Sequence, residues 1–187
     1  VDLKAFTERF YRDVTKSRLQ PVLDTLVYLA RETEVWFEIT NLIIPGRNDD
    51  ESELDAMTSW VVETLGPDVP IHFSAFHPDY RMLDTPRTPF ETLAMARRIA
   101  RRNGVRHAYV GNVRDLGRQS SYCHACGARA IGRDWYEVSD WRLTAAGCCL
   151  ACGTPMAGVF EARPGGWGRK RLPVAIDGYV PVDVEIG

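Results

Sequence analysis

The stretch VWFEITNLII, Val35–Ile44, is followed directly by Pro45 and Gly46 and indicates the fold class. It is mostly apolar and rich in β-branched and aromatic residues, which is typical of a buried parallel strand. Because its two polar residues, Glu38 and Thr40, are two positions apart, we expect both side chains on one face of the strand.

Strands and helices are expected to alternate on both sides of this stretch, over residues 1–115. Further strands are predicted at 1–4, 71–76 and 105–110, and helices at 21–33, 50–65 and 88–103. Asp50 with Glu53, and Thr88 with Glu91, are spaced as capping boxes for the last two helices. The order predicts an α/β fold with a parallel sheet and right-handed crossovers. Four strands are too few for a closed barrel of eight, which leaves an open sheet or part of a barrel.

Composition narrows the class of protein. The chain has 187 residues, 45% of them hydrophobic, and a formal net charge of -2, so charge gives no reason to expect nucleic acid or an anionic membrane as partner. No apolar stretch approaches the roughly 20 residues that span a bilayer, so we expect neither a membrane span nor a signal peptide in this sequence. The chain opens on Val1 with a strand already in progress, so we expect it to begin inside a larger protein.

The sequence pattern changes near Asp115. Residues 116–187 hold all five cysteines and many glycines, and no long helix is predicted there. We therefore predict two units, 1–115 and 116–187, of which the second is too small to bury much core and needs a staple. An odd number of cysteines, four of them in two Cys-x-x-Cys pairs, argues against a disulfide framework and for a reducing, cytoplasmic setting.

Two similar motifs supply that staple, CHACG from residue 123 and CLACG from residue 149. Such turns direct both sulfurs to one metal, and the glycine after each second cysteine accommodates the tight turn. The predicted ligands of a structural zinc ion are Cys123, Cys126, Cys149 and Cys152. A single iron in a rubredoxin-like site and two redox pairs are the alternatives, and visible colour would distinguish iron from zinc. Cys148 is expected to be a spare thiol, and His124 to point outward.

Polar residues near the strands are the candidates for ligand binding, because ligands of open parallel sheets bind beyond the carboxyl ends of the strands. The candidates are Asp2, Lys4, Glu38, Thr40 and His77. Each also has a structural interpretation: Asp2 with Lys4 as an ion pair, Glu38 as a carboxylate satisfied by an arginine, and His77 as a turn residue before proline.

These residues resemble a known family. Asp2-Leu3-Lys4, the strand 35–44 running into PGRNDD, and the strand ending at Phe76-His77 resemble the later half of a radical S-adenosylmethionine (SAM) enzyme. The glycyl-radical-enzyme activases, such as the pyruvate formate-lyase activating enzyme, are the nearest type. The two cysteine motifs and WGRKRLP, residues 167–173, are more similar to the radical SAM proteins of the AmmeMemoRadiSam system.

The resemblance, which covers essentially the whole chain, implies the later half of a partial (β/α)6 TIM-like barrel followed by a zinc-ribbon-like subdomain. It implies that Asp2 and Lys4 lie near the ribose and amino-acid parts of SAM, that the strand around Thr40 flanks the cofactor, and that His77 contacts its adenosine. Glu38 is grouped with these cofactor-binding candidates because it shares a strand face with Thr40.

One departure from the family concerns the [4Fe-4S] cluster. The family holds this cluster with Cys-x-x-x-Cys-x-x-Cys, and no such run is present here, since Cys148 and Cys152 have the first spacing but position 155 is Pro. The glycine-rich segment for the cofactor's amino group is missing too. We therefore expect the full-length parent to carry the cluster and SAM, and this chain alone to be inert.

Two other interpretations stay open. In the first, the four-cysteine unit and the basic run 169–171 dock a protein or a nucleic acid, with nucleic acid disfavoured because the basic patch is short. In the second, this unit lies over the barrel mouth and shapes a substrate pocket, with Trp135, Tyr136 and Trp141 as lid or core. The substrate is unknown, and a protein is one candidate.

Overall fold

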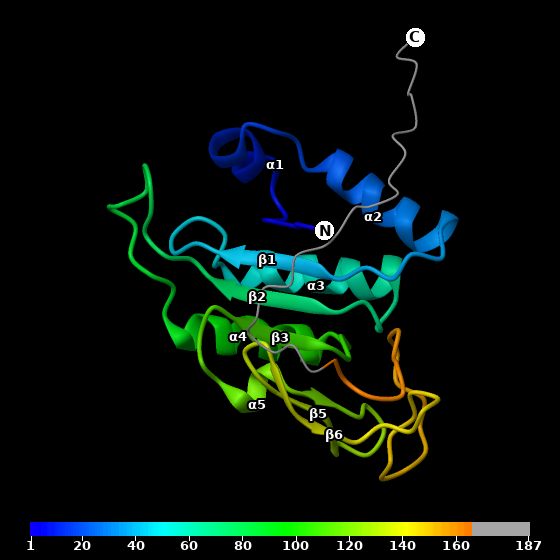
Figure 1. Cartoon of the computed structure of the whole chain (residues 1–187). Coiled ribbons are helices and arrows are strands. Elements are labelled where there is room, and N and C mark those ends of the chain that lie inside the picture. The colour runs from blue at the N-terminus through cyan, green and yellow to red at the C-terminus, as the bar shows by residue number, and fades with distance from the viewer. Residues whose placement is uncertain (166–187) are drawn as a thin grey trace, which may run out of the picture.

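In the computed structural model, which describes residues 1–165, a parallel sheet forms the centre of the first part of the chain (Figure 1). Its strands, hydrogen-bonded in sequence order, are β1 (Ile39–Ile43), β2 (Ile71–Ala75) and β3 (Ala108–Gly111). The predicted first strand is reduced to one parallel bridge, Asp2 to Thr40, along the free edge of β1. The mixed α/β class and the parallel sheet are confirmed.

Two of the helices, α3 (Glu51–Leu65) and α4 (Phe90–Arg102), cover one face of this sheet, and we call that face the outer face (Figure 1). The helices are α1 (Glu8–Phe10), the π-helical turn η1 (Tyr11–Thr15), α2 (Gln20–Glu32), α3 (Glu51–Leu65), α4 (Phe90–Arg102) and the short α5 (Leu116–Gln119). The main core lies between the sheet and α3 and α4, with Phe73 of β2, Met57 of α3 and Leu93 of α4 fully buried. The opposite, inner face carries Thr40 of β1, His72 of β2 and Tyr109 of β3, which are paired in register.

The helix caps differ from the predicted capping boxes. Asp50 caps α3 as predicted and accepts hydrogen bonds from Ser52 N and Glu53 N. Glu53, however, accepts from Phe6 N at 2.7 Å, so it ties the N-terminal segment to α3. Thr88 does not cap α4. Its buried hydroxyl accepts from Phe76 N at 2.7 Å, so it fastens the chain after β2.

The predicted strand 35–44 is wrong in its first part. Pairing with β2 begins only where Ile39 N donates to Pro70 O at 2.8 Å, and Pro70 has no N–H with which to continue the ladder. Val35 and Trp36 therefore lie outside the sheet and remain 60% and 40% exposed.

A second, antiparallel sheet consists of β4 (Ser121–Tyr122), β5 (Arg129–Asp134) and β6 (Glu137–Trp141). The first cysteine motif connects β4 to β5, and the second follows β6. It lies beside β3 (Figure 1). Its core is one small cluster of buried residues, Cys123, Ala130, Ile131, Leu143, Cys149 and Met156. The boundary at residue 115 stays a prediction. The segment 167–173 lies outside the described residues.

Within residues 1–165, no helix combines the length and the apolar character that crossing a bilayer requires.

One buried asparagine joins the N-terminal segment to β1. Asn48 is 2% exposed, and its Oδ1 accepts from Ile44 N at 2.7 Å. Its Nδ2 donates to Leu42 O at 2.9 Å and also to Lys4 O. This side chain thus satisfies backbone groups of two segments that are far apart in the sequence.

We expect Asn48→Ala to lower the free energy of unfolding by about 3 kcal/mol, because it leaves several buried backbone groups without a partner. Urea denaturation followed by circular dichroism measures the loss. The matched control is Asp49→Ala, which removes one hydrogen bond from Gly46 N and should cost about 1 kcal/mol or less. Equal losses in the two variants would contradict this role of Asn48.

Candidate metal centre and adjoining pocket

Four cysteine sulfurs converge on one point between the two motifs. The Sγ atoms of Cys123, Cys126, Cys149 and Cys152 all lie within 4.8 Å of one another. Cys123 Sγ is 3.6 Å from Cys152 Sγ, and Cys126 Sγ is 3.8 Å from Cys149 Sγ. A disulfide would need about 2.05 Å, whereas four thiolates in a tetrahedron around one zinc ion, at about 2.3 Å each, lie about 3.8 Å apart. The arrangement therefore fits a single four-coordinate metal.

The two motifs have the same backbone geometry. Cys123 N donates to Ala128 O and Gly127 N donates to Cys123 O, both at 2.9 Å. In the second motif, Gly153 N donates to Cys149 O at 2.8 Å. Gly127 and Gly153 have φ values of 72° and 76°, a left-handed conformation that glycine adopts without steric cost. Each glycine thus closes the turn that presents its two sulfurs.

The ionisation of the thiols also suits a cation. Hydrogen bonds from the Thr154 hydroxyl and backbone N–H lower the pKa of Cys152 to about 6. A hydrogen bond from the Ala128 backbone lowers the pKa of Cys126, but the neighbouring sulfurs and burial outweigh it and raise the value to about 12. Four thiols this close do not all ionise by themselves, and a divalent cation supplies the charge that lets them do so.

Two residues next to the four cysteines, Cys148 and His124, were predicted not to bind the metal. Cys148 lies outside the group of four, as predicted, and its Sγ is 3.9 Å from Ala146 O. His124 differs from the expectation that it points outward. It is half-buried, and its Nδ1 is buried without a hydrogen-bond partner among residues 1–165.

A row of polar side chains crosses the inner face of the first sheet. Asp2 pairs with Thr40, Thr40 with His72, and His72 with Tyr109 in the register of the parallel strands. Residues paired in this way point to the same face. The N-terminal segment and all three strands therefore each contribute one side chain to the row.

At one end of the row, Asp2 has two polar partners. Thr40 Oγ1 donates to its carboxylate, and Lys4 Nζ lies 2.9 Å from Asp2 Oδ1. The hydrogen bond from Thr40, followed by the contact with Lys4, lowers the pKa of Asp2. The structure thus brings together three of the predicted site residues.

Glu38 has a histidine as partner where an arginine was expected. His72 Nε2 lies 2.6 Å from Glu38 Oε2, and Trp36 Nε1 donates to Glu38 Oε1 at 3.2 Å. The hydrogen bond with His72 is the main cause that lowers the pKa of Glu38. The His72 ring also packs against Tyr109 of β3, with centroids 4.9 Å apart. This carboxylate–imidazole pair can orient a proton at the inner face of the sheet.

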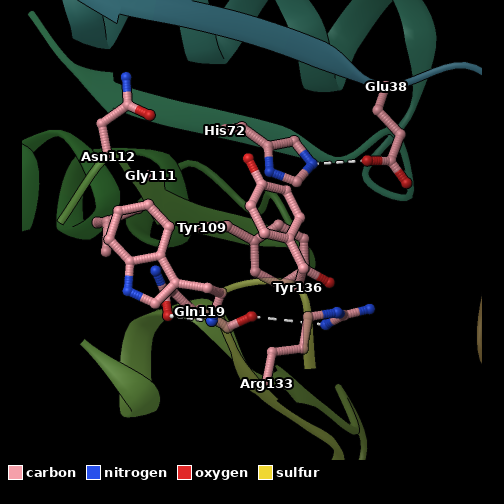
Figure 2. A pocket seen from close by; sticks show the side chains of 10 residues that line it. Glu38, His72, Tyr109, Gly111, Asn112, Gln119, Arg133 and Tyr136 are labelled. Carbon is pink, nitrogen blue, oxygen red and sulfur yellow. Dashed lines mark hydrogen bonds and ion pairs between the residues drawn. The ribbon is translucent and has the colours of Figure 1, made fainter. Parts of the chain in front are cut away.

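A cavity of about 350 Å³ opens beside this pair (Figure 2). Its lining includes Glu38, which directly precedes β1, His72 of β2 and Tyr109 of β3. Arg133 of β5 and Tyr136 of the turn between β5 and β6 line it as well. Figure 2 shows Tyr109 between the Glu38–His72 pair and Arg133. The four-cysteine unit therefore forms one wall of the cavity.

Two contacts hold that wall against β3. Ser121 Oγ lies 2.6 Å from Tyr109 Oη and accepts from Arg133 Nη1, also at 2.6 Å. The Arg133 guanidinium lies 5.5 Å from the centre of the Tyr109 ring. At the tip of the hairpin, Trp135 adopts a left-handed backbone with φ of 55°, which is uncommon for a residue with a bulky side chain.

The predicted site residues do not form one rim. Glu38 and Thr40 lie at the amino end of β1, whereas His77 is exposed just after the carboxyl end of β2 and does not line the cavity. His72 and Arg133 were not among the predicted site residues. His72 had a signal, because it is the first polar residue of the alternating segment IHFSA, 71–75, whereas Arg133 had none.

Comparisons with known proteins place the fold. No protein-family model matches the chain. It is 44% identical over 133 residues to the uncharacterized protein MJ0808 of Methanocaldococcus jannaschii, a match that covers 71% of this chain and 39% of that protein. A domain of pyruvate-formate lyase-activating enzyme from Bacteroides vulgatus ATCC 8482 matches with a TM-score of 0.51 and 18% identity, over 59% of this chain and 65% of that one. The chain thus shares its fold with an activating-enzyme domain, and it spans well under half the length of its archaeal relative.

Proposed function

We propose that this chain is the C-terminal part of a radical SAM enzyme of the glycyl-radical-activase type, similar to the AmmeMemoRadiSam proteins. The observation that carries the proposal is the row of polar side chains on the inner face of the parallel sheet, with α3 and α4 on its outer face. This is the arrangement of a partial (β/α)6 barrel, whose interior holds a cofactor. The likeness to an activating-enzyme domain supports the same fold.

Within this proposal, Asp2 and Lys4 hold the ribose and amino-acid parts of SAM, and His77, at the carboxyl end of β2, contacts the adenosine. Because the Thr40 hydroxyl donates a hydrogen bond to the Asp2 carboxylate, we propose that Thr40 positions Asp2. Glu38 is engaged by His72, so we assign this pair to the adjoining pocket. In the full-length parent the [4Fe-4S] cluster and SAM would supply a 5′-deoxyadenosyl radical, and the ligands of that cluster are absent from this chain.

The four-cysteine unit is proposed to hold zinc and to form a wall of the substrate pocket. The sulfur distances and the equivalent glycine turns support the metal, and the contacts of Ser121 and Arg133 with Tyr109 support the wall. A separate docking module for nucleic acid is less well supported, because Tyr136 lines a pocket beside the acidic Glu38. The free thiols and the thiolate site are in keeping with a reducing, cytoplasmic setting.

The cofactor assignment predicts a lysine-specific effect. In the full-length parent with its cluster and a reductant, we expect SAM to be converted to 5′-deoxyadenosine, and Lys4→Ala to slow this by about tenfold or more through lost positioning. Lys16→Ala is the matched control, because Lys16 is exposed and its Nζ donates to Asp13 O within η1. Chromatography of the nucleoside measures the rates. If the wild-type parent forms no 5′-deoxyadenosine, the proposed function is wrong.

The metal assignment predicts about one zinc ion per chain, by elemental analysis of the purified protein. Cys149→Ser should lose the metal and unfold the second sheet, because its small core cannot replace metal binding worth roughly 10–16 kcal/mol. Cys148→Ser, one residue earlier, should keep the metal, since its sulfur lies outside the group of four. Visible absorption from bound iron, or metal loss in both variants, would overturn the assignment.

A further inference from the structure

A second cavity lies between α4 and the first cysteine motif. It is separate from the pocket that Glu38 and His72 line. Its volume is about 190 Å³, well below the roughly 300 Å³ at which pockets for drug-sized ligands begin. Arg97 and Arg101 of α4, Arg106 and His107 of the following segment, and Cys123 of the first cysteine motif line it. Three guanidinium groups and an imidazole thus share a space suited to a small ion.

The two arginines of α4 are held in place by backbone carbonyls. Arg97 Nε donates to Ala108 O at 2.8 Å, and Arg101 Nη1 donates to Val105 O at 3.4 Å and to Arg106 O. Neither forms an ion pair with a carboxylate within residues 1–165, and the terminal amino groups of Arg97 have no hydrogen-bond partner there. These bonds fix the direction of the guanidinium groups and leave donors free.

The acidic groups nearby are already engaged. Asp68 pairs with Arg106 at 2.9 Å, and Asp115 pairs with Arg118 at 2.6 Å. Burial lowers the pKa of Arg97, and the positive charge of Arg101 lowers it further. Arg97 and Arg101 therefore carry positive charge that no carboxylate of the described chain offsets by direct pairing, whereas Arg106 is paired with Asp68.

A buried imidazole in the cavity wall also lacks a partner. His107 is 4% exposed, and its Nε2 has no hydrogen-bond partner in the described part of the chain. His124 Nδ1, which interacts electrostatically with His107, is buried and unpartnered in the same way. Buried polar atoms almost always have a partner, so the unpaired nitrogen of a residue that lines this cavity supports a ligand there.

We propose that this cavity binds a tetrahedral oxyanion of the phosphate or sulfate class. Guanidinium groups match such ions because their planar N–H pairs bond two oxygens at once. The ion would bridge α4 and the first cysteine motif and would offset the repulsion between Arg97 and Arg101. This site does not depend on the proposed radical SAM function, and it is tested without it.

The test is calorimetric titration of the metal-loaded chain with inorganic phosphate, at an ionic strength held constant with sodium chloride. The wild type should show saturable binding, and Arg97→Gln should weaken it about tenfold or more, because hydrogen bonds to charged groups are lost. Arg98→Gln is the matched control. Arg98 is exposed on the same helix and lies outside the cavity, so binding should stay within about twofold.

Arg101→Gln is the second variant, since Arg101 is exposed and its loss is less of a risk to folding. Metal content checks that each variant is folded. A parallel titration with methyl phosphate distinguishes the two sources of the ion: binding of both compounds indicates the phosphate group of a larger molecule, and binding of inorganic phosphate alone indicates the free ion. Absence of saturable binding in the wild type, or equal weakening by Arg98→Gln, would overturn the proposal.

Discussion

The meeting of four cysteine sulfurs is the constraint on which the second half of the described structure depends. Its hydrophobic core is a cluster of six residues, two of which are themselves cysteines of the group. Burial on that scale does not offset the conformational entropy of ordering three short strands and their loops. A metal ion held by both motifs would connect segments that are more than 20 residues apart in the chain, and it would give this unit a fixed shape that packing alone does not provide.

That fixed shape has consequences for the first half of the chain. The hairpin between β5 and β6 places Arg133 against Tyr109, and Ser121 joins the two sheets by hydrogen bonds. The inner face of the parallel sheet would otherwise be open beside His72. The four-cysteine unit instead covers this part of the inner face. The resulting pocket has the Glu38–His72 pair as its opposite wall. The four-cysteine group and the pocket are thereby connected through a few side chains.

Features with local causes were predictable from the sequence. The cysteine motifs, the helices α2 and α3, and the Asp50 cap follow from spacing and periodicity within one segment. Features that depend on distant partners were not. The length of β1 depends on Pro70, whose missing N–H ends the ladder. The Glu38–His72 pair depends on the register of β1 and β2. The position of Arg133 depends on the packing of the second sheet against Tyr109 of β3. The candidate ligand residues were all expected at the carboxyl ends of the strands. Glu38 and Thr40 lie instead at the amino end of β1, because β1 begins four residues later than predicted.

X-ray absorption at the zinc edge of the purified chain tests the central claim most directly, because it reports the ligand shell of the metal itself. The account predicts one shell of four sulfur neighbours at about 2.3 Å, with no nitrogen or oxygen in the first shell. A mixed shell that includes oxygen or nitrogen would contradict the assignment of all four cysteines to one ion. So would a protein that purifies without metal and has its cysteines joined as disulfides.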